Sequence, residues 1–240
     1  SACSRLASSG ACTLLSPVNA STTAVSVWSY ISVTKPYIEF IGRQWELSLL
    51  SSCYQSVTQS RQGITVYIDG MEGIGKSALI HRFTEVINIK SSSVVLLDLC
   101  CPYVARQSAL QYLTRQLLRL PMHASDAIVR SKIASSTVSI ALQVFICLMA
   151  GVALRNTETR LLSAMGNEQL QAASSEALAE LIDPRTTDDP FVLIIEDINL
   201  AEAGFIDVIK RFAQLVQSRP LLLCITERKT GKYSNRHVWL

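Results

Sequence analysis

A glycine-rich segment of eight residues, GMEGIGKS at 70–77, restricts the fold of this chain more than any other feature. It fits the pattern G-x-x-x-x-G-K-[ST] and stands between a β-branched run at 64–69 and a helical pattern that runs from Ser77 to about Ile87. Glycines let the backbone turn tightly and bring its N–H groups against phosphate oxygens, while the start of the helix favours an anion. The segment therefore predicts a phosphate-binding loop between a strand and a helix.

Each residue type in this loop has an expected task. The Lys76 ammonium would reach the β- and γ-phosphates of a nucleotide, and the Ser77 hydroxyl would ligate Mg²⁺. We predict ATP and Mg²⁺ as the cofactors. The residues expected to contact them here are Gly70, Met71, Glu72, Gly73, Ile74, Gly75, Lys76, Ser77 and Ala78.

Strand patterns alternate with helical patterns through the rest of the chain. Apolar strands are expected at 64–69, 94–99, 191–195 and 221–225. Helices are expected at 43–60, 77–87, 105–120 and 202–217, and in several pieces across 125–182. The strands are apolar on both faces, which is typical of a parallel sheet covered by helices on both sides. The predicted fold class is α/β, a three-layer P-loop NTPase with a parallel sheet.

Two carboxylates, Glu196 and Asp197, follow the strand at 191–195. In a P-loop fold such a strand lies near the phosphate loop, so one carboxylate can hold the Mg²⁺ water shell while the other polarises the attacking water. By position Glu196 is the metal-side residue and Asp197 is the candidate base, although Asp before Glu is the more familiar order. The alternative is that the two acidic residues merely end a strand.

Polar residues also follow the strand at 221–225. A side chain there, from Thr226 or Arg228, could contact the γ-phosphate or the attacking water. An ordinary polar strand end is the alternative interpretation. Together with the acidic pair, Thr226 and Arg228 complete the set of candidate catalytic residues.

Composition and charge exclude several classes of protein. Apolar residues make up 49% and charged residues 17% of the chain, which is typical of a globular protein rather than a disordered one. The net charge of +3 comes without any run of basic residues, so we expect no nucleic acid partner from this segment. Seven cysteines without a C-x-x-C pair fit a reducing compartment, and we expect a cytoplasmic location.

The almost wholly apolar stretch at 139–154 has two interpretations, a membrane span or a buried helix. It is shorter than the roughly 20 residues that a spanning helix needs, and Gln143 interrupts it. We therefore expect a core helix and no membrane span.

Three segments are expected from the composition along the chain. Residues 1–36 are rich in Ser, Thr and Ala, contain a β-like run at 24–31, and fit a linker or the tail of a preceding domain. The ATPase domain is expected at 37–232, and the start of a truncated following region at 233–240. We expect the chain to be a segment of a longer protein.

With these pieces in order, the chain resembles the ATPase domain of STAND and AAA+-like signalling proteins. It is similar in particular to the ATPase segment of soluble adenylyl cyclases and to large ATP-dependent transcriptional regulators. The resemblance covers about residues 36–230. It rests on FIGRQWEL at 40–47, the phosphate loop, DLCCPY at 98–103, EDINLAE at 196–202 and PLLLCITER at 220–228.

The resemblance implies further features. It implies that Ile41, Gly42 and Arg43 fold over the adenine, and that the strand leading to Thr226 lies between the strand before the loop and the strand before the acidic pair. The chain departs from the family pattern near the acidic pair, where the family has His, Trp and Asp. The residues at these positions here are Asn199, Leu200 and Glu202.

The function predicted on this basis is that of a regulatory ATPase or nucleotide switch within a multidomain signalling protein. ATP would be bound with Mg²⁺ and slowly hydrolysed to ADP and phosphate. The expected partners are ATP or ADP and neighbouring regulatory or catalytic domains of the same protein, with oligomer formation left open. The alternatives are a non-hydrolysing nucleotide-binding module and an origin-recognition-type, DNA-associated ATPase, with a small-molecule kinase as a weaker third.

Overall fold

The computed structural model describes residues 42–87, 94–100, 108–183 and 190–228. All of them belong to one unit that spans 40–240. The β-like run at 24–31, Ile41 and the region at 233–240 lie outside the described residues. The start of the helix expected at 105–120 also lies outside them.

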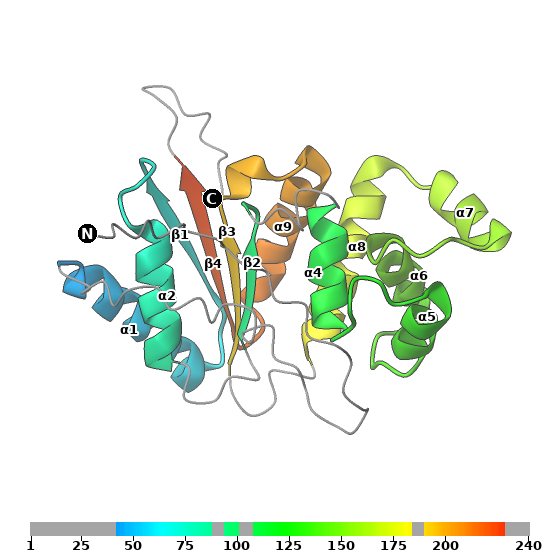
Figure 1. Ribbon diagram of the computed structural model, residues 1–240. Coiled ribbons are helices and arrows are strands. Elements are labelled where there is room, and N and C mark those ends of the chain that lie inside the picture. Colours follow the sequence, from blue (N-terminus) through cyan, green and yellow to red (C-terminus); the bar gives the residue numbers. More distant parts are fainter. Residues whose placement is uncertain (1–41, 88–93, 101–107, 184–189, 229–240) are drawn as a thin grey trace, which may run out of the picture. The chain divides into compact units, whose positions relative to one another are not determined.

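The described strands form one parallel sheet with the order β1-β4-β3-β2 (Figure 1). Their bounds are β1, Ile64–Gly70; β2, Val94–Asp98; β3, Phe191–Glu196; and β4, Leu221–Arg228. β4 lies between β1 and β3, as the resemblance implied. Because parallel strands end at the same edge of a sheet, the glycine-rich loop after β1 and the polar residues after β3 lie beside the end of β4.

The strands differ in how completely they are covered. Every residue of β3 is buried, and so is every residue of β4 except the last. In β1, however, Thr65, Tyr67 and Asp69 are exposed, while Ile64, Val66 and Ile68 are half-buried. The expectation of cover on both faces was wrong for β1, because this strand stands at an edge of the described sheet and only one of its faces is partly covered.

Helices surround the sheet at the positions that the sequence predicted. Their bounds are α1, Gln44–Ser60; α2, Lys76–Ile87; α4, Ala109–Leu117; α5, Asp126–Ala134; α6, Ile140–Met149; α7, Asn156–Ser163; α8, Asn167–Ile182; and α9, Ala203–Val216. A short 3₁₀ helix, η4 (Ile198–Leu200), follows β3.

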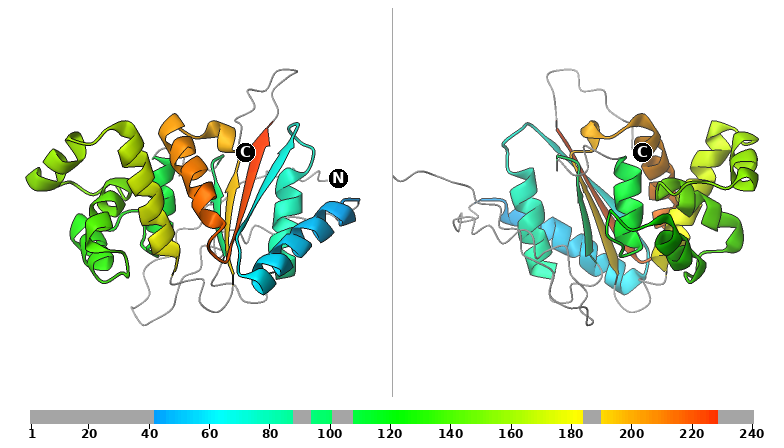
Figure 2. Two further views of the ribbon diagram at one scale, coloured as in Figure 1. Left: turned by 180° about the vertical axis from the view of Figure 1, so that it is seen from behind. Right: turned by 45° about the vertical axis from the view of Figure 1, so that its right-hand side comes forward.

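Two hydrophobic clusters show that the fold has three layers. On one face, α1 and α2 pack Val57 and Phe83 against the strand residues Ile194 and Leu222. On the other face, the helices of the 109–216 region share a cluster with Leu193 and other strand residues. Figure 2 shows the two helical layers on opposite sides of the sheet. The predicted three-layer α/β P-loop fold is thus confirmed.

The apolar stretch at 139–154 contains α6, a helix of the core. Phe145, Ile146 and Met149 are buried in the cluster that α6 shares with α4, α8 and α9. None of the helices in the described ranges is long and apolar enough to cross a membrane. The buried-helix interpretation is confirmed.

A buried arginine that the sequence did not suggest connects the helices on this side. Arg115 of α4 donates from Nε to the Ala150 carbonyl at 2.9 Å. Its Nη1 donates to the carbonyls of Met122 at 2.8 Å and Ala124 at 3.1 Å. Because buried carbonyls need donors, this one side chain fixes the end of α6 and the turn before α5 against α4.

Candidate functional site

The loop between β1 and α2 takes a conformation that its glycines permit. Gly73 and Gly75 have φ values of 74° and 93°, a region that side-chain-bearing residues rarely adopt. A Cβ at Gly73 would meet no atom within 4 Å, so its backbone is open to a ligand. Ser77 and Ala78, in the first turn of α2, are exposed. The first N–H groups of a helix lack intrahelical acceptors, which suits this end of α2 to an anion.

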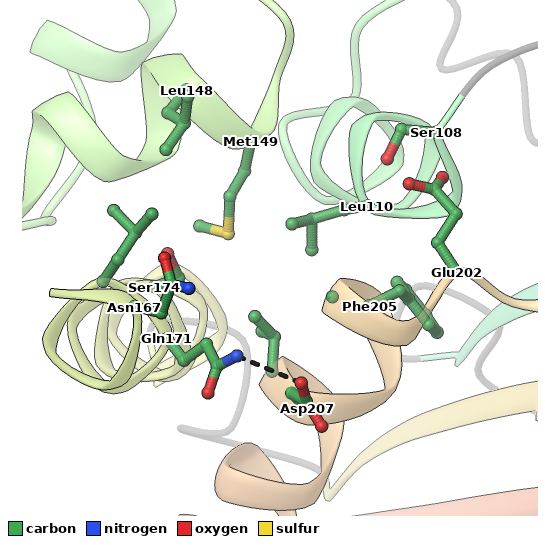
Figure 3. Close-up of a pocket in the computed structure, with 13 residues that line it drawn as sticks. Ser108, Leu110, Leu148, Met149, Asn167, Gln171, Ser174, Glu202, Phe205 and Asp207 are labelled. Atoms are coloured by element: carbon green, nitrogen blue, oxygen red, sulfur yellow. Dashed lines mark hydrogen bonds between the residues drawn. The ribbon is translucent and has the colours of Figure 1, made fainter. Parts of the chain in front are cut away.

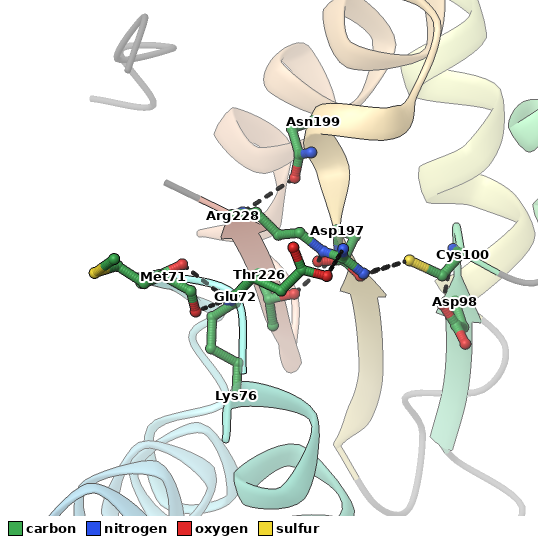
Figure 4. Close-up of polar contacts among 10 residues, drawn as sticks. Met71, Glu72, Lys76, Asp98, Cys100, Asp197, Asn199, Thr226 and Arg228 are labelled. Carbon is green, nitrogen blue, oxygen red and sulfur yellow. Dashed lines mark hydrogen bonds and ion pairs between the residues drawn. The ribbon is translucent and has the colours of Figure 1, made fainter. Parts of the chain in front are cut away.

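Lys76 folds back over the start of the loop. Its Nζ donates to the carbonyls of Gly70 at 2.8 Å and Met71 at 3.0 Å, and the residue is only 7% exposed (Figure 4). Carbonyl dipoles alone compensate a buried ammonium poorly. The geometry therefore presents a desolvated positive charge at the position where the motif requires one.

Arg43 brings the start of α1 to the same loop. Its Nη2 donates to the Ile74 carbonyl, and Gly42 and Arg43 both have positive φ values, 86° and 124°. Such a backbone is strained for a residue with a side chain, and strain of this kind clusters at functional sites. The segment that was expected to cover the adenine thus contacts the phosphate loop.

Asp197 leaves the line of β3 because its backbone is left-handed, with φ 57° and ψ 49°. The Asp197 N–H donates to the hydroxyl oxygen of Thr226 at 2.9 Å, and both residues are buried. Thr226 was expected to contact the γ-phosphate or the attacking water. The Thr226 hydroxyl also holds the backbone of the candidate base, and its contact with a phosphate or water stays a prediction.

Arg228 lies at the centre of the polar contacts in Figure 4. Its Nε and Nη2 donate to the two carboxylate oxygens of Asp197, at 2.8 and 2.9 Å. Its Nη1 donates to Oε1 of Glu72 in the loop at 2.8 Å. The side-chain oxygen of Asn199 accepts from the Arg228 N–H at 3.0 Å and so ties η4 to the end of β4.

Cys100, two residues after β2, completes this cluster. Its Sγ donates to Oδ2 of Asp197 at 2.9 Å and lies 2.7 Å from Nη2 of Arg228. Burial raises the pKa of the Cys100 thiol to about 11, with help from the hydrogen bond to Asp197. Burial opposes ionisation of Asp197 too, but hydrogen bonds from Arg228 and Cys100 and the charge of Lys76 outweigh it and lower the pKa of Asp197.

The Arg228 guanidinium lies among three side chains that could otherwise bind a metal ion. The ligand atoms of Asp98, Cys100 and Asp197 lie within 4.8 Å of one another, which would allow a metal ion. Arg228 donates to two of these three residues. A divalent ion would therefore fit among them only if Arg228 moved.

Glu196, the predicted metal-side residue, is buried at the end of β3 and pairs in register with Asp98.

The structure brings together most of the residues that the sequence selected, and it adds others. The phosphate loop, Arg43, Asp197, Thr226 and Arg228 form one connected set, while direct contact of any of them with nucleotide stays a prediction. The residues that the sequence reasoning left out are Asp98, Cys100 and Asn199. The signal for Asp98 and Cys100 was their position at the end of an apolar strand, since all strands of a parallel sheet end at one edge.

A separate pocket of about 440 Å³ lies among α4, α6, α8 and α9 (Figure 3). Apolar side chains such as Met149 and Phe205 line the pocket, together with the polar residues Ser174 and Asp207. Nε2 of Gln171 donates a hydrogen bond to Oδ2 of Asp207 at 3.0 Å. None of the predicted nucleotide-binding residues lines this pocket.

Comparison with known proteins identifies a family for most of the chain. The model of a family described as AAA ATPase domain matches residues 39–225, which include the phosphate loop, Asp197 and the whole described sheet up to Ile225. No curated protein matches the chain.

Proposed function

We propose, since this chain belongs to the AAA ATPase domain family, that its glycine-rich loop binds ATP together with Mg²⁺. Membership in the family makes the domain a nucleotide-binding ATPase module. The observation that carries the finer proposal is the buried Lys76 ammonium, which is held over the loop by two carbonyls. A polyphosphate would replace these weak acceptors with charged ones, and charge-assisted hydrogen bonds are the stronger kind.

The residues of the loop fit such a ligand. Gly73 and Gly75 have the positive φ values that phosphate-binding loops use to turn backbone N–H groups toward an anion, and Ser77 is exposed, as a metal ligand would be. Mg²⁺ bound to the phosphates would neutralise their charge, with Ser77 and Glu196 as the proposed protein partners. Gly42 and Arg43 would cover the base from the side of α1.

For hydrolysis, we assign to Asp197 the task of polarising the attacking water. Thr226 supports this task by holding the Asp197 backbone. Arg228 and Cys100 contact both carboxylate oxygens of Asp197 and lower its pKa, which makes it a weaker base, so we propose that turnover requires Arg228 to leave Asp197. The same observation favours a second candidate function, a module that binds ATP without hydrolysing it.

The wider function that we propose is a nucleotide switch in a multidomain signalling protein, of the kind found in adenylyl cyclase-like proteins. Exchange of ATP for ADP would bias the arrangement of neighbouring regulatory or catalytic domains. The support for this part of the proposal is the resemblance of the five segments described above.

Equilibrium binding of a fluorescent ATP analogue with Mg²⁺ to the full 240-residue chain tests the nucleotide site. We expect binding that ATP and ADP compete and GTP does not, and that Lys76→Ala weakens by tenfold or more. Lys132→Ala, which removes an exposed ammonium from α5, is the charge-matched control and should bind as the wild type does. A folded wild type without binding, or equal binding by Lys76→Ala, would refute the proposal.

Single-turnover measurements then separate the two candidate functions. If the chain is an ATPase, bound ATP is converted to ADP and phosphate, and Asp197→Asn slows the conversion without preventing binding. If it is a non-hydrolysing module, ATP is recovered unchanged from the wild type and from the variant.

A further inference from the structure

The phosphate loop carries its own carboxylate, and that carboxylate binds an arginine from another strand. Glu72 occupies the third position of the loop, and its Oε1 accepts from Nη1 of Arg228 at 2.8 Å. The Glu72 side chain is 79% exposed. A negative charge beside a site for polyphosphate opposes binding, so Glu72 needs an explanation that the phosphate-binding chemistry of the loop does not supply.

Arg228 is shared between Glu72 and Asp197. The Arg228 side chain is 29% exposed and that of Asp197 is 9% exposed, so the pair with Asp197 is the more desolvated one. All three guanidinium nitrogens have partners: Nε and Nη2 contact Asp197, and Nη1 contacts Glu72. A new anion on the loop side of Arg228 competes with these carboxylates for the guanidinium, and the exposed Glu72 is easier to displace than the buried Asp197.

The strand register places this guanidinium beside the loop. Arg228 is the register partner of Gly70, the first residue of the loop, and Lys76 contacts the Gly70 carbonyl. Arg228 and Lys76 thus stand as two cations at one end of the loop. In the proposed site Lys76 and the start of α2 would hold a diphosphate without disturbing Arg228, and a third phosphate would add an anion within the surroundings that Arg228 and Lys76 share.

We propose that Glu72 determines how the loop discriminates between nucleoside triphosphates and diphosphates, by competing with the terminal phosphate for Arg228. The inference rests on the proposed ATP site. Without a terminal phosphate, Glu72 and Asp197 hold the guanidinium and both oxygens of Asp197 stay occupied. A triphosphate exchanges Glu72 for a phosphate oxygen on Nη1, pulls the guanidinium toward the loop and releases Asp197 for its work on water.

Glu72→Gln tests this competition, because glutamine keeps the size of the side chain and removes its charge. Dissociation constants for ATP and ADP, each with Mg²⁺, are measured on the full chain. An exposed ion pair contributes up to about 1 kcal/mol, so the ratio of the ADP constant to the ATP constant should rise roughly two- to fivefold. Glu176→Gln, an exposed carboxylate on α8, is the matched control and should leave the ratio unchanged.

A double-variant cycle identifies Arg228 as the intermediary. In an Arg228→Gln background, Glu72→Gln should no longer change the ratio of the ADP to the ATP dissociation constant. The guanidinium for which Glu72 and the terminal phosphate compete is then absent. Melting curves establish that both variants are folded before binding is compared.

The outcomes separate this inference from the proposal on which it rests. Equal strengthening of ATP and ADP binding in Glu72→Gln would mean general charge repulsion and would overturn the competition, as would an unchanged ratio. In both cases the wild type still binds, and Lys76→Ala still binds at least tenfold more weakly. If neither the wild type nor Lys76→Ala binds nucleotide, the proposed site fails and this inference fails with it.

Discussion

Arg228, the last residue of β4, holds both carboxylate oxygens of Asp197, the residue after β3, at 2.8 and 2.9 Å. This two-point geometry is the strong form of an arginine–carboxylate pair, and it joins the ends of two neighbouring strands. It also makes Asp197 a poor base in the arrangement described here, since the guanidinium and the Cys100 thiol stabilise its charged form. The strength of Asp197 as a base therefore depends on the position of the Arg228 side chain.

Removal of Arg228 should destabilise the fold in a pH-dependent way. In Arg228→Gln, the buried Asp197 loses its ionic partner, and we expect about 1–3 kcal/mol less stability at pH 7. The folded-state pKa of Asp197 is lowered, so the stabilisation is present above the ordinary value of about 3.9 and is lost as the pH falls through the folded-state pKa. Urea unfolding at pH 7 and pH 3 should therefore show a smaller difference from the wild type at pH 3. Arg160→Gln, at an exposed arginine of α7, should show no such difference.

The Thr226 hydroxyl should stabilise the fold as the acceptor of the Asp197 N–H hydrogen bond. Thr226→Val keeps the shape but leaves the buried Asp197 N–H without its partner, which should cost about 1–3 kcal/mol. Thr226→Ser keeps the oxygen and should recover most of the loss in chemical denaturation. If valine and serine behaved alike, the hydrogen bond would have no part in holding Asp197.

An ion pair far from the candidate site offers a second pH test. Hydrogen bonds from Arg130 lower the pKa of Glu158 from 4.5 to about 2, against the opposing effect of burial. The lowered pKa means that this stabilisation is complete above about pH 4.5 and disappears as the pH falls toward 2. We expect Glu158→Gln to unfold more easily than the wild type at pH 7, by roughly 1–3 kcal/mol, and similarly to it near pH 2. A constant difference across this range would contradict the assignment.

Gly63, just before β1, should not tolerate a side chain. A Cβ there would lie 2.1 Å from the Val216 carbonyl oxygen and 2.7 Å from that of Arg219, and backbone cannot yield as a side chain can. Gly63→Ala should lower the free energy of unfolding by roughly 1–3 kcal/mol or more. Gly204→Ala is the informative control, because a Cβ there meets nothing within 4 Å and lies in α9. It should be neutral or stabilise by up to about 1 kcal/mol in thermal or urea unfolding.

The helices, the strands and the place of the glycine-rich loop could be predicted from the amino-acid sequence alone. The spacing of glycines before Lys76 and Ser77 requires a tight turn into a helix, and local backbone preferences are enough to specify it. The wholly apolar runs of β3 and β4 likewise predicted buried parallel strands. Asp197 and Thr226 could be selected because they follow such strands. The order of the strands came from the resemblance, since periodicity does not encode which strands are neighbours.

Tertiary structure alone decided which side chains meet at the strand ends. Glu72 and Arg228 are 156 positions apart, and Cys100 and Arg228 are 128 apart, so no local pattern links them. The insertion of β4 between β1 and β3 places Arg228 within reach of the loop and of Asp197. The same order leaves β1 at the edge of the described sheet, against the expectation of full cover. Local preferences act over a few residues, whereas these contacts depend on strand order, register and the left-handed turn at Asp197, all of which the packing of the whole domain determines.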